Sequence, residues 1–178
     1  MGLKFAKKKI PQAAFFQADL CKDNLNIPSH HLKWATHATC SEVLEHLDDP
    51  ITCLKNTGKL LKKGATLVIS VPGGPRSKFD NYVGHRKHYT AKILRHELEA
   101  AGYTVENIYC AGFPFYNLYK LAIILKGQKI ITDAKKHEHN NNTLIAIFMK
   151  CFHLLFKFNL FDSYFGWTVL AKATWNHD

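Results

Sequence analysis

The sequence lacks the features that mark secreted and membrane-spanning proteins. Its five cysteines include no CxxC pair and no metal-ligand spacing, and an odd count without a secretory signal argues for reduced thiols. The first residues are rich in lysine and carry no apolar core of a signal peptide. There is no run of about 18 apolar residues, so we expect no membrane span. Together these absences lead us to expect a cytoplasmic protein.

A concentrated basic block is also absent, although the chain is basic overall. It has 24 Lys and Arg against 14 Asp and Glu, a formal net charge of +10. Such a charge can attract nucleic acid, anionic membranes or acidic substrates. The cationic residues are scattered in short groups, namely Lys7 to Lys9, Lys62–Lys63, Arg86–Lys87 and Lys135–Lys136. We therefore favour a solvated basic surface and expect no DNA-binding site.

The apolar pattern predicts one domain over residues 1–178, in which strands alternate with helices. The clearest strand is 66–71, which is apolar on both faces, as in a parallel strand that helices cover on both sides. Thr90 is a typical cap for a helix that runs to Ala101 and ends at Gly102. A helix over 56–62 is expected to end at Gly64. Further strands are predicted at 13–19, 32–40, 103–109 and 167–173.

Five segments, in order along the chain, carry a resemblance to a known family. They are FFQADL, CSEVLEHLDDP, LLKKGATLVISVPG, GHRKHYTAKILRHELEAAGY and GWTVLAKATW. Together they resemble a class I S-adenosylmethionine (SAM)-dependent methyltransferase of the small-molecule type, over roughly residues 1–112 and 164–175. The resemblance implies an α/β fold: an incomplete Rossmann-like doubly wound sheet with a final antiparallel strand. It also implies an aromatic-rich helical lid, which we place at residues 113–160.

The glycine-rich loop of this family is missing. In complete members a GxGxG-type loop after the first strand wraps the cofactor, and an acid ends the second strand. Gly73–Gly74 follows a different strand and precedes Pro75. The segment MGLKFAKKKIP resembles the helix after the second strand, so we interpret Met1 as an internal methionine or the start of a truncated gene. Without the first two strands, 13–19 lacks a partner and 32–40 becomes an edge. We therefore expect poor folding or weak SAM binding unless a second chain supplies the N-terminal half.

The resemblance also assigns the cofactor-binding residues. Asp19 would accept from the adenine amino group, and Leu20 would flank the ring. Cys40, Ser41 and Glu42 would lie beside the transferred methyl group, at the carboxyl end of a strand, where ligands bind in such sheets. Methyl transfer depends on positioning rather than on a nucleophile, so we interpret Cys40 as a small packing residue.

His85 and His88 are the predicted catalytic residues, because a histidine in the loop after the 66–71 strand can remove a proton from a hydroxyl or amine. The alternative is that both histidines anchor the loop by bonding to Glu42 or Glu45. A further alternative is a metal site made of Glu42, Glu45, His46 and His85, since small-RNA 2′-O-methyltransferases use a similar ExxEH pattern. We expect no metal.

The predicted function is SAM-dependent methylation of a small molecule at oxygen, nitrogen or carbon. A helix over 143–158 would place Lys150, His153 and Lys157 on one face, with apolar residues around them. We expect this segment to pack on the sheet or, with the aromatic residues near 113–119, to roof an apolar acceptor, rather than to contact a membrane. The alternatives are metal-assisted RNA 2′-O-methylation and a non-catalytic fragment or interaction subunit.

Overall fold

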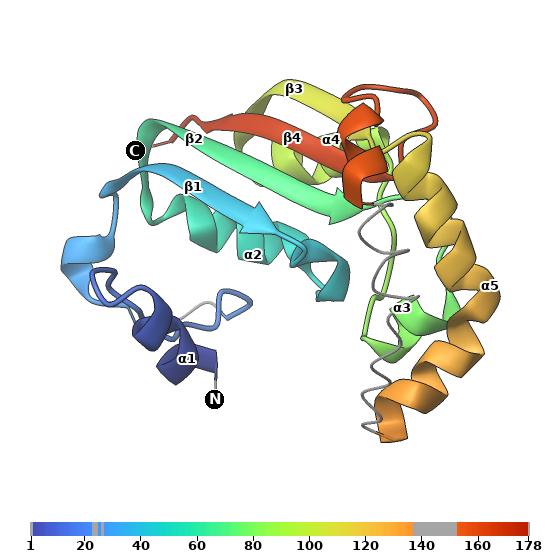
Figure 1. The fold of residues 1–178 in the computed structure, drawn as a ribbon. Coiled ribbons are helices and arrows are strands. Elements are labelled where there is room, and N and C mark those ends of the chain that lie inside the picture. The colour runs from blue at the N-terminus through green and yellow to red at the C-terminus, as the bar shows by residue number, and fades with distance from the viewer. Residues whose placement is uncertain (1, 23–24, 26, 137–152, 178) are drawn as a thin grey trace.

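The computed structural model describes residues 2–22, 25, 27–136 and 153–177 and contains a four-stranded sheet in the order β1-β2-β4-β3. Strand β1 (Ala35–Ser41) is parallel to β2 (Leu61–Pro72). Strand β4 (Thr168–Trp175) is antiparallel both to β2 and to β3 (Tyr103–Ala111), which confirms the expected antiparallel last strand. Figure 1 shows β1 at the edge of this sheet.

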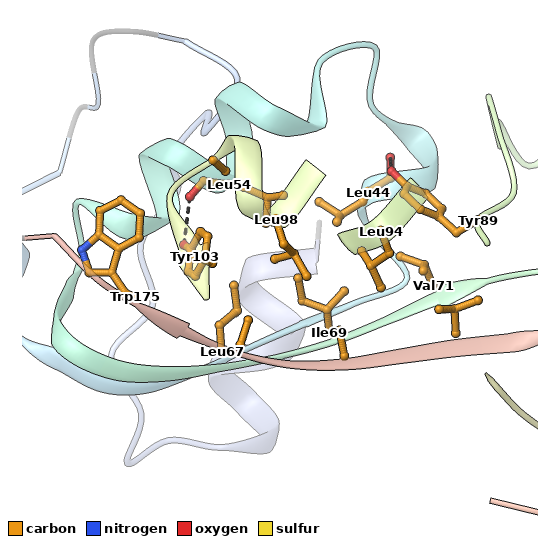
Figure 2. Packing of buried hydrophobic residues seen from close by; sticks show 14 of the residues in the cluster. Leu44, Leu54, Leu67, Ile69, Val71, Tyr89, Leu94, Leu98, Tyr103 and Trp175 are labelled. Carbon is orange, nitrogen blue, oxygen red and sulfur yellow. Dashed lines mark hydrogen bonds between the residues drawn. The ribbon is translucent and has the colours of Figure 1, made fainter. Parts of the chain in front are cut away.

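Two helices, α2 (Pro50–Gly58) and α4 (Ala91–Ala100), cover one face of the sheet. Figure 2 shows side chains of both helices pointing at the apolar face of β2. That face carries Leu67, Ile69 and Val71, all with no exposed surface. Val68, on the opposite face, is 44% exposed. In the described part of the chain β2 is thus covered on one face, where the sequence predicted cover on both.

The helix ends follow local chemistry. The Asp49 side chain accepts from the Thr52 N–H at the start of α2, and Thr90 accepts from the Ile93 N–H at the start of α4, as predicted. The predicted helix end at Gly64 is wrong. Helix α2 ends at Gly58, where an added Cβ would lie 2.4 Å from the Trp175 ring, and Gly64 (φ 78°) lies within β2.

The N-terminal segment begins with α1 (Gly2–Lys9), but residues 13–19 form no strand. The predicted strand is wrong because nothing described lies beside it to complete a hydrogen-bonded ladder. The Asn56 side chain instead holds the following turn, donating to the carbonyl oxygens of Leu20 (2.8 Å) and Lys22 (2.9 Å). The β1 edge is left unpaired among the described residues, as the missing neighbours predicted.

The predicted lid is only partly described. Helix α5 (Phe115–Lys136) lies within the segment predicted as the lid. Figure 1 shows α5 running beside the short helix α3 (Lys78–Tyr82). Of the helix predicted over 143–158, residues 143–152 lie outside the described part, and Phe156–Phe158 form a 3-10 helix. Among the described helices, none is both long and apolar enough to cross a membrane.

The one-sided burial of β2 predicts a strong asymmetry between neighbouring residues. Replacing Ile69 by Ala should lower the free energy of unfolding by about 2–5 kcal/mol, because it leaves a cavity in the core. Replacing Val68 by Ala, one residue away on the exposed face, should change it by about 0.5 kcal/mol or less. Urea denaturation measures both. Equal losses would show that the second face of β2 is also buried.

Candidate functional site

The carboxyl ends of β1 and β2 meet through their side chains. Ser41 Oγ lies 2.5 Å from Ser70 Oγ, and Ser70 Oγ donates to Glu42 Oε1 at 3.2 Å. Glu42 adopts a left-handed backbone conformation (φ 53°), which turns the chain away from the strand. The structure therefore brings the predicted residues Ser41 and Glu42 together with Ser70, which sequence reasoning did not single out.

A cavity of about 440 Å³ lies between the N-terminal segment and the residues that follow β1, and Cys40, Ser41 and Glu42 are not among its lining residues. Asp19 and Leu20 line it from one side, and Val43 and Leu47 line it from the other. The Cys21 N–H and the Lys22 side chain hydrogen-bond to the Asp19 carboxylate and hold its pKa below the usual range. An ionised acceptor and an apolar side chain thus share one cavity wall.

Cys40 behaves as a packing residue in this structure. It is half-buried against the core, and burial, together with the nearby Glu45 charge, raises the pKa of its thiol to about 11. A thiol with this pKa is protonated at neutral pH and is a poor nucleophile.

A second group of polar side chains lies beyond the carboxyl end of β2, around Asp80 of α3. Asp80 Oδ1 lies 3.7 Å from His85 Nδ1, and Asp80 Oδ2 lies 3.7 Å from His88 Nε2. The two rings approach each other with His85 Nδ1 at 3.3 Å from His88 Nε2. The two predicted catalytic histidines are therefore adjacent, and they share one carboxylate.

The Asp80 carboxylate is ionised despite its burial. Burial acts to raise its pKa, but the N–H and hydroxyl of Ser77, both 2.7 Å away, and the nearby Lys120 lower it overall. Lys120 comes from α5, and its Nζ lies 3.9 Å from Asp80 Oδ1. Burial lowers the pKa of this amine, and Asp80 opposes that effect.

Sequence reasoning missed both Asp80 and Lys120. The Ser77-x-x-Asp80 spacing, which forms a capping box, was the available signal for Asp80. Nothing in the sequence pattern pointed to Lys120, because it reaches the site only through the packing of α5 against α3.

Arg86 anchors the loop that carries the histidines, in addition to the hydrogen bond of His88 to Gly74. The Arg86 N–H donates to the Glu45 carbonyl oxygen (2.7 Å), and its Nε donates to the His46 carbonyl oxygen (2.9 Å). Its guanidinium also pairs with Asp48 at 2.7 Å. Among the described residues the Glu45 carboxylate oxygens have no hydrogen-bond partner, and the carboxylate beside both histidines is that of Asp80.

Glu45 is fully buried, and neither of its carboxylate oxygens has a hydrogen-bond partner among the described residues. Burial raises its pKa. One ligand atom each of Glu45, His46 and His85 lies within 4.8 Å of the others, and the same holds for Asp80, His85 and His88. Glu42, the fourth residue of the alternative metal set, belongs to neither group.

The buried histidines make stability depend on pH. Burial lowers the pKa of His85 and of His88, so each favours its neutral form in the folded state. When the pKa of a histidine is lower in the folded state than in the unfolded state, its contribution to stability is complete above the unfolded pKa of about 6.5. That contribution is lost as the pH falls through the pKa of the folded state, because the unfolded chain then binds more protons. We therefore expect the free energy of unfolding to fall from pH 7.5 to pH 5.

The variant His88→Asn should flatten this decline, because the amide can still donate to the Gly74 carbonyl oxygen but does not titrate. The matched control His96→Asn, at an exposed position of α4, should leave the decline unchanged. Urea denaturation at pH 5, 6 and 7.5 measures the effect. If the free energy of unfolding of His88→Asn fell with pH as steeply as that of the wild type, His88 would not be a source of the pH dependence.

Comparisons with known proteins agree with this geometry. Residues 33–108 match a family model described as a methyltransferase domain. No curated protein matches the sequence significantly. The fold resembles the solved structure of the 4+2 cyclase SpnF, at 14% identity and a TM-score of 0.59, covering 99% of this chain and 63% of that one.

Two further structures share the fold. One is a Bacillus halodurans protein named as a methyltransferase, at 18% identity and a TM-score of 0.54, covering 98% of this chain and 79% of that one. The other, from Galdieria sulphuraria, is named as a sarcosine dimethylglycine methyltransferase, at 8% identity and a TM-score of 0.55, covering 99% and 66%. The chain thus spans less than two thirds of SpnF. The chain has the fold of these structures, two of which are named as methyltransferases, and its residues 33–108 match the methyltransferase-domain family model.

Proposed function

We propose that this chain takes part in SAM-dependent methylation of a small-molecule acceptor. The observation that carries the proposal is the cavity between Asp19 and Leu20 on one side and Val43 and Leu47, just after β1, on the other. Ligands of doubly wound sheets bind at the carboxyl ends of parallel strands, and β1 and β2 are the parallel pair here. SAM would supply an activated methyl group, so the chain has only to bind, orient and exclude water.

The residues of the cavity suit the parts of SAM that they would meet. The ionised Asp19 carboxylate can accept from the adenine amino group, and Leu20 can cover the ring. Ser41 and Glu42, at the end of β1, would face the part of the cofactor near the transferred methyl. Cys40 would pack beneath them without reacting.

His85 and His88 would serve an acceptor that loses a proton, which means a hydroxyl or an amine. The residues after β3 offer an apolar wall for the rest of that molecule. A hollow of about 320 Å³ there is lined by Tyr116, Phe156 and Phe161. The rings of Tyr116 and Phe156 lie 6.1 Å apart in an edge-to-face arrangement. The acceptor that suits this combination is apolar with one reactive polar group.

We also propose that a second polypeptide segment pairs with β1. This strand has hydrogen-bonded neighbours on one side only among the described residues. Next to its start, a cavity of about 520 Å³ is lined by Phe16, His31, Trp34 and other apolar residues. A bare strand edge beside apolar surface favours pairing with another strand.

Two other functions remain as alternatives, each with an observation in its favour. The convergence of Glu45, His46 and His85 favours metal-assisted RNA 2′-O-methylation. The fold is also compatible with chemistry other than methyl transfer, as the cyclase SpnF illustrates, and with a non-catalytic role.

Calorimetric titration of the purified chain with SAM tests the proposal. We expect binding, and Asp19→Ala should weaken it by roughly 10-fold to 100-fold, because one hydrogen bond to a charged group is lost. The control Glu99→Ala removes an exposed acid of α4 and should bind like the wild type.

A folded chain that does not bind SAM would contradict the proposal and favour the non-catalytic role. The same titration after treatment with EDTA separates the enzymatic alternatives. SAM binding that EDTA does not change agrees with small-molecule methylation, as does methyl transfer to a small-molecule acceptor that EDTA does not change in a separate assay. Dependence on Mg²⁺ or Mn²⁺ favours the metal-assisted reaction.

A further inference from the structure

The contacts of His85 and His88 specify which nitrogen of each ring carries a proton. His88 Nδ1 lies 3.0 Å from the Gly74 carbonyl oxygen. A carbonyl oxygen can only accept, so Nδ1 of His88 must donate and must carry the proton. In the neutral ring Nε2 is then an acceptor, and burial lowers the pKa of His88, which favours the neutral ring.

The same reasoning extends to His85. Its Nδ1 faces two groups that can only accept, His88 Nε2 at 3.3 Å and Asp80 Oδ1 at 3.7 Å. His85 Nδ1 therefore carries its proton as well, and the lone pair of the neutral ring lies on Nε2. Both histidines thus adopt the Nδ1–H tautomer, and the proton acceptor of the pair is His85 Nε2.

Asp80 can fix this arrangement only while it is ionised and immobile. Ser77 holds its Oδ2 with two hydrogen bonds of 2.7 Å, and Lys120 lies 3.9 Å from its Oδ1. Both Asp80 and Lys120 are only 7% exposed. A buried carboxylate paired with a buried ammonium is costly to form, and in such a pair each charge depends on the other.

Three further side chains lie near His85, those of His46, Arg76 and Glu45. The ring of His46 contacts the His85 ring edge-on, with centroids 4.7 Å apart. Arg76 donates to the backbone carbonyl oxygens of His85 and Arg86 rather than to the imidazoles. Glu45, in the same cluster, has a pKa raised by burial.

We propose that Asp80 is a positioning residue that, together with His88, sets the tautomer of His85, so that His85 Nε2 accepts the proton of the acceptor. The Gly74 carbonyl oxygen sets the tautomer of His88, which serves only to orient the His85 ring. This inference rests on the proposed function. It narrows the acceptor to a molecule with an O–H or N–H group. As the new bond from that oxygen or nitrogen to the methyl carbon forms, the carbon–sulfur bond of SAM breaks, and the proton passes to His85 Nε2 and then to water.

The positioning role of Asp80 follows from the positive charge that His85 carries after it has taken up the proton. Taking up a proton turns His85 into a cation with Nδ1 aimed at the Asp80 carboxylate. A fixed negative charge beside that nitrogen stabilises the cation and keeps the ring in orientation, as the carboxylate does in a catalytic triad. Ser77 and, to a smaller extent, Lys120 of α5 lower the pKa of Asp80 and so support the same function.

Long-range ¹H–¹⁵N NMR of the ¹⁵N-labelled full chain at pH 8 tests the assignment without an acceptor or SAM. It distinguishes protonated from unprotonated ring nitrogens. We expect Nδ1–H for both His85 and His88, whereas exposed His96 should show no such restriction. Asp80→Asn should shift His85 toward a tautomer mixture, and the control Glu99→Gln, at an exposed acid of α4, should not.

An Nε2–H tautomer for His85 in the wild type would overturn the proposal. So would an unchanged His85 spectrum in a folded Asp80→Asn variant. Loss of the free Nε2 signal on adding Zn²⁺ or Mg²⁺ would also overturn it, because His85 would then be a metal ligand. The outcome is independent of SAM calorimetry: failure to bind SAM removes the methyl donor from the proposed reaction but leaves the tautomer assignment to be judged by NMR alone.

Discussion

Strand β2 is the constraint on which the rest of the structure depends. It is the strand that pairs with β1 in parallel and with β4 in antiparallel, and Ile69 at its centre has no exposed surface. Its end also fixes the site loops: the Gly73 N–H donates to the Trp167 carbonyl oxygen, and the Tyr89 N–H donates to that of Pro72, both at 2.8 Å. Moving β2 would displace both the strand-end cavity and the histidine loop.

Beyond that strand lie two buried carboxyl groups, Glu45 and Asp80, whose pKa values shift in opposite directions. Glu45 has no hydrogen-bond partner among the described residues for its side-chain oxygens, and burial raises its pKa. Asp80 is also buried, but Ser77 and Lys120 supply donors and positive charge, so its pKa is lowered. Burial thus favours a neutral Glu45, whereas Asp80 remains charged and can orient the two histidines.

The sequence predicted the elements whose signals are local. The β-branched run of β2 and the Thr90 cap of α4 are properties of a few neighbouring residues, and both were correctly placed. Residues 13–19 have strand-like composition but no strand, because pairing requires a partner. Within the site, Ser41 and Glu42 could be predicted because they lie at the end of a predicted strand. Lys120 could not, because it is 40 positions from Asp80 and meets it only through tertiary packing.

The fold alone does not decide the chemistry, since a 4+2 cyclase and named methyltransferases share it at low identity. The central claim is that the cavity between residues 17–21 and the residues that follow β1 holds SAM. Ultraviolet cross-linking of radiolabelled SAM to the purified chain, followed by peptide mapping, tests it most directly. The account predicts label in peptides containing residues 17–21 or 40–47. Label confined to α5, or a folded chain that takes up no label, would contradict it.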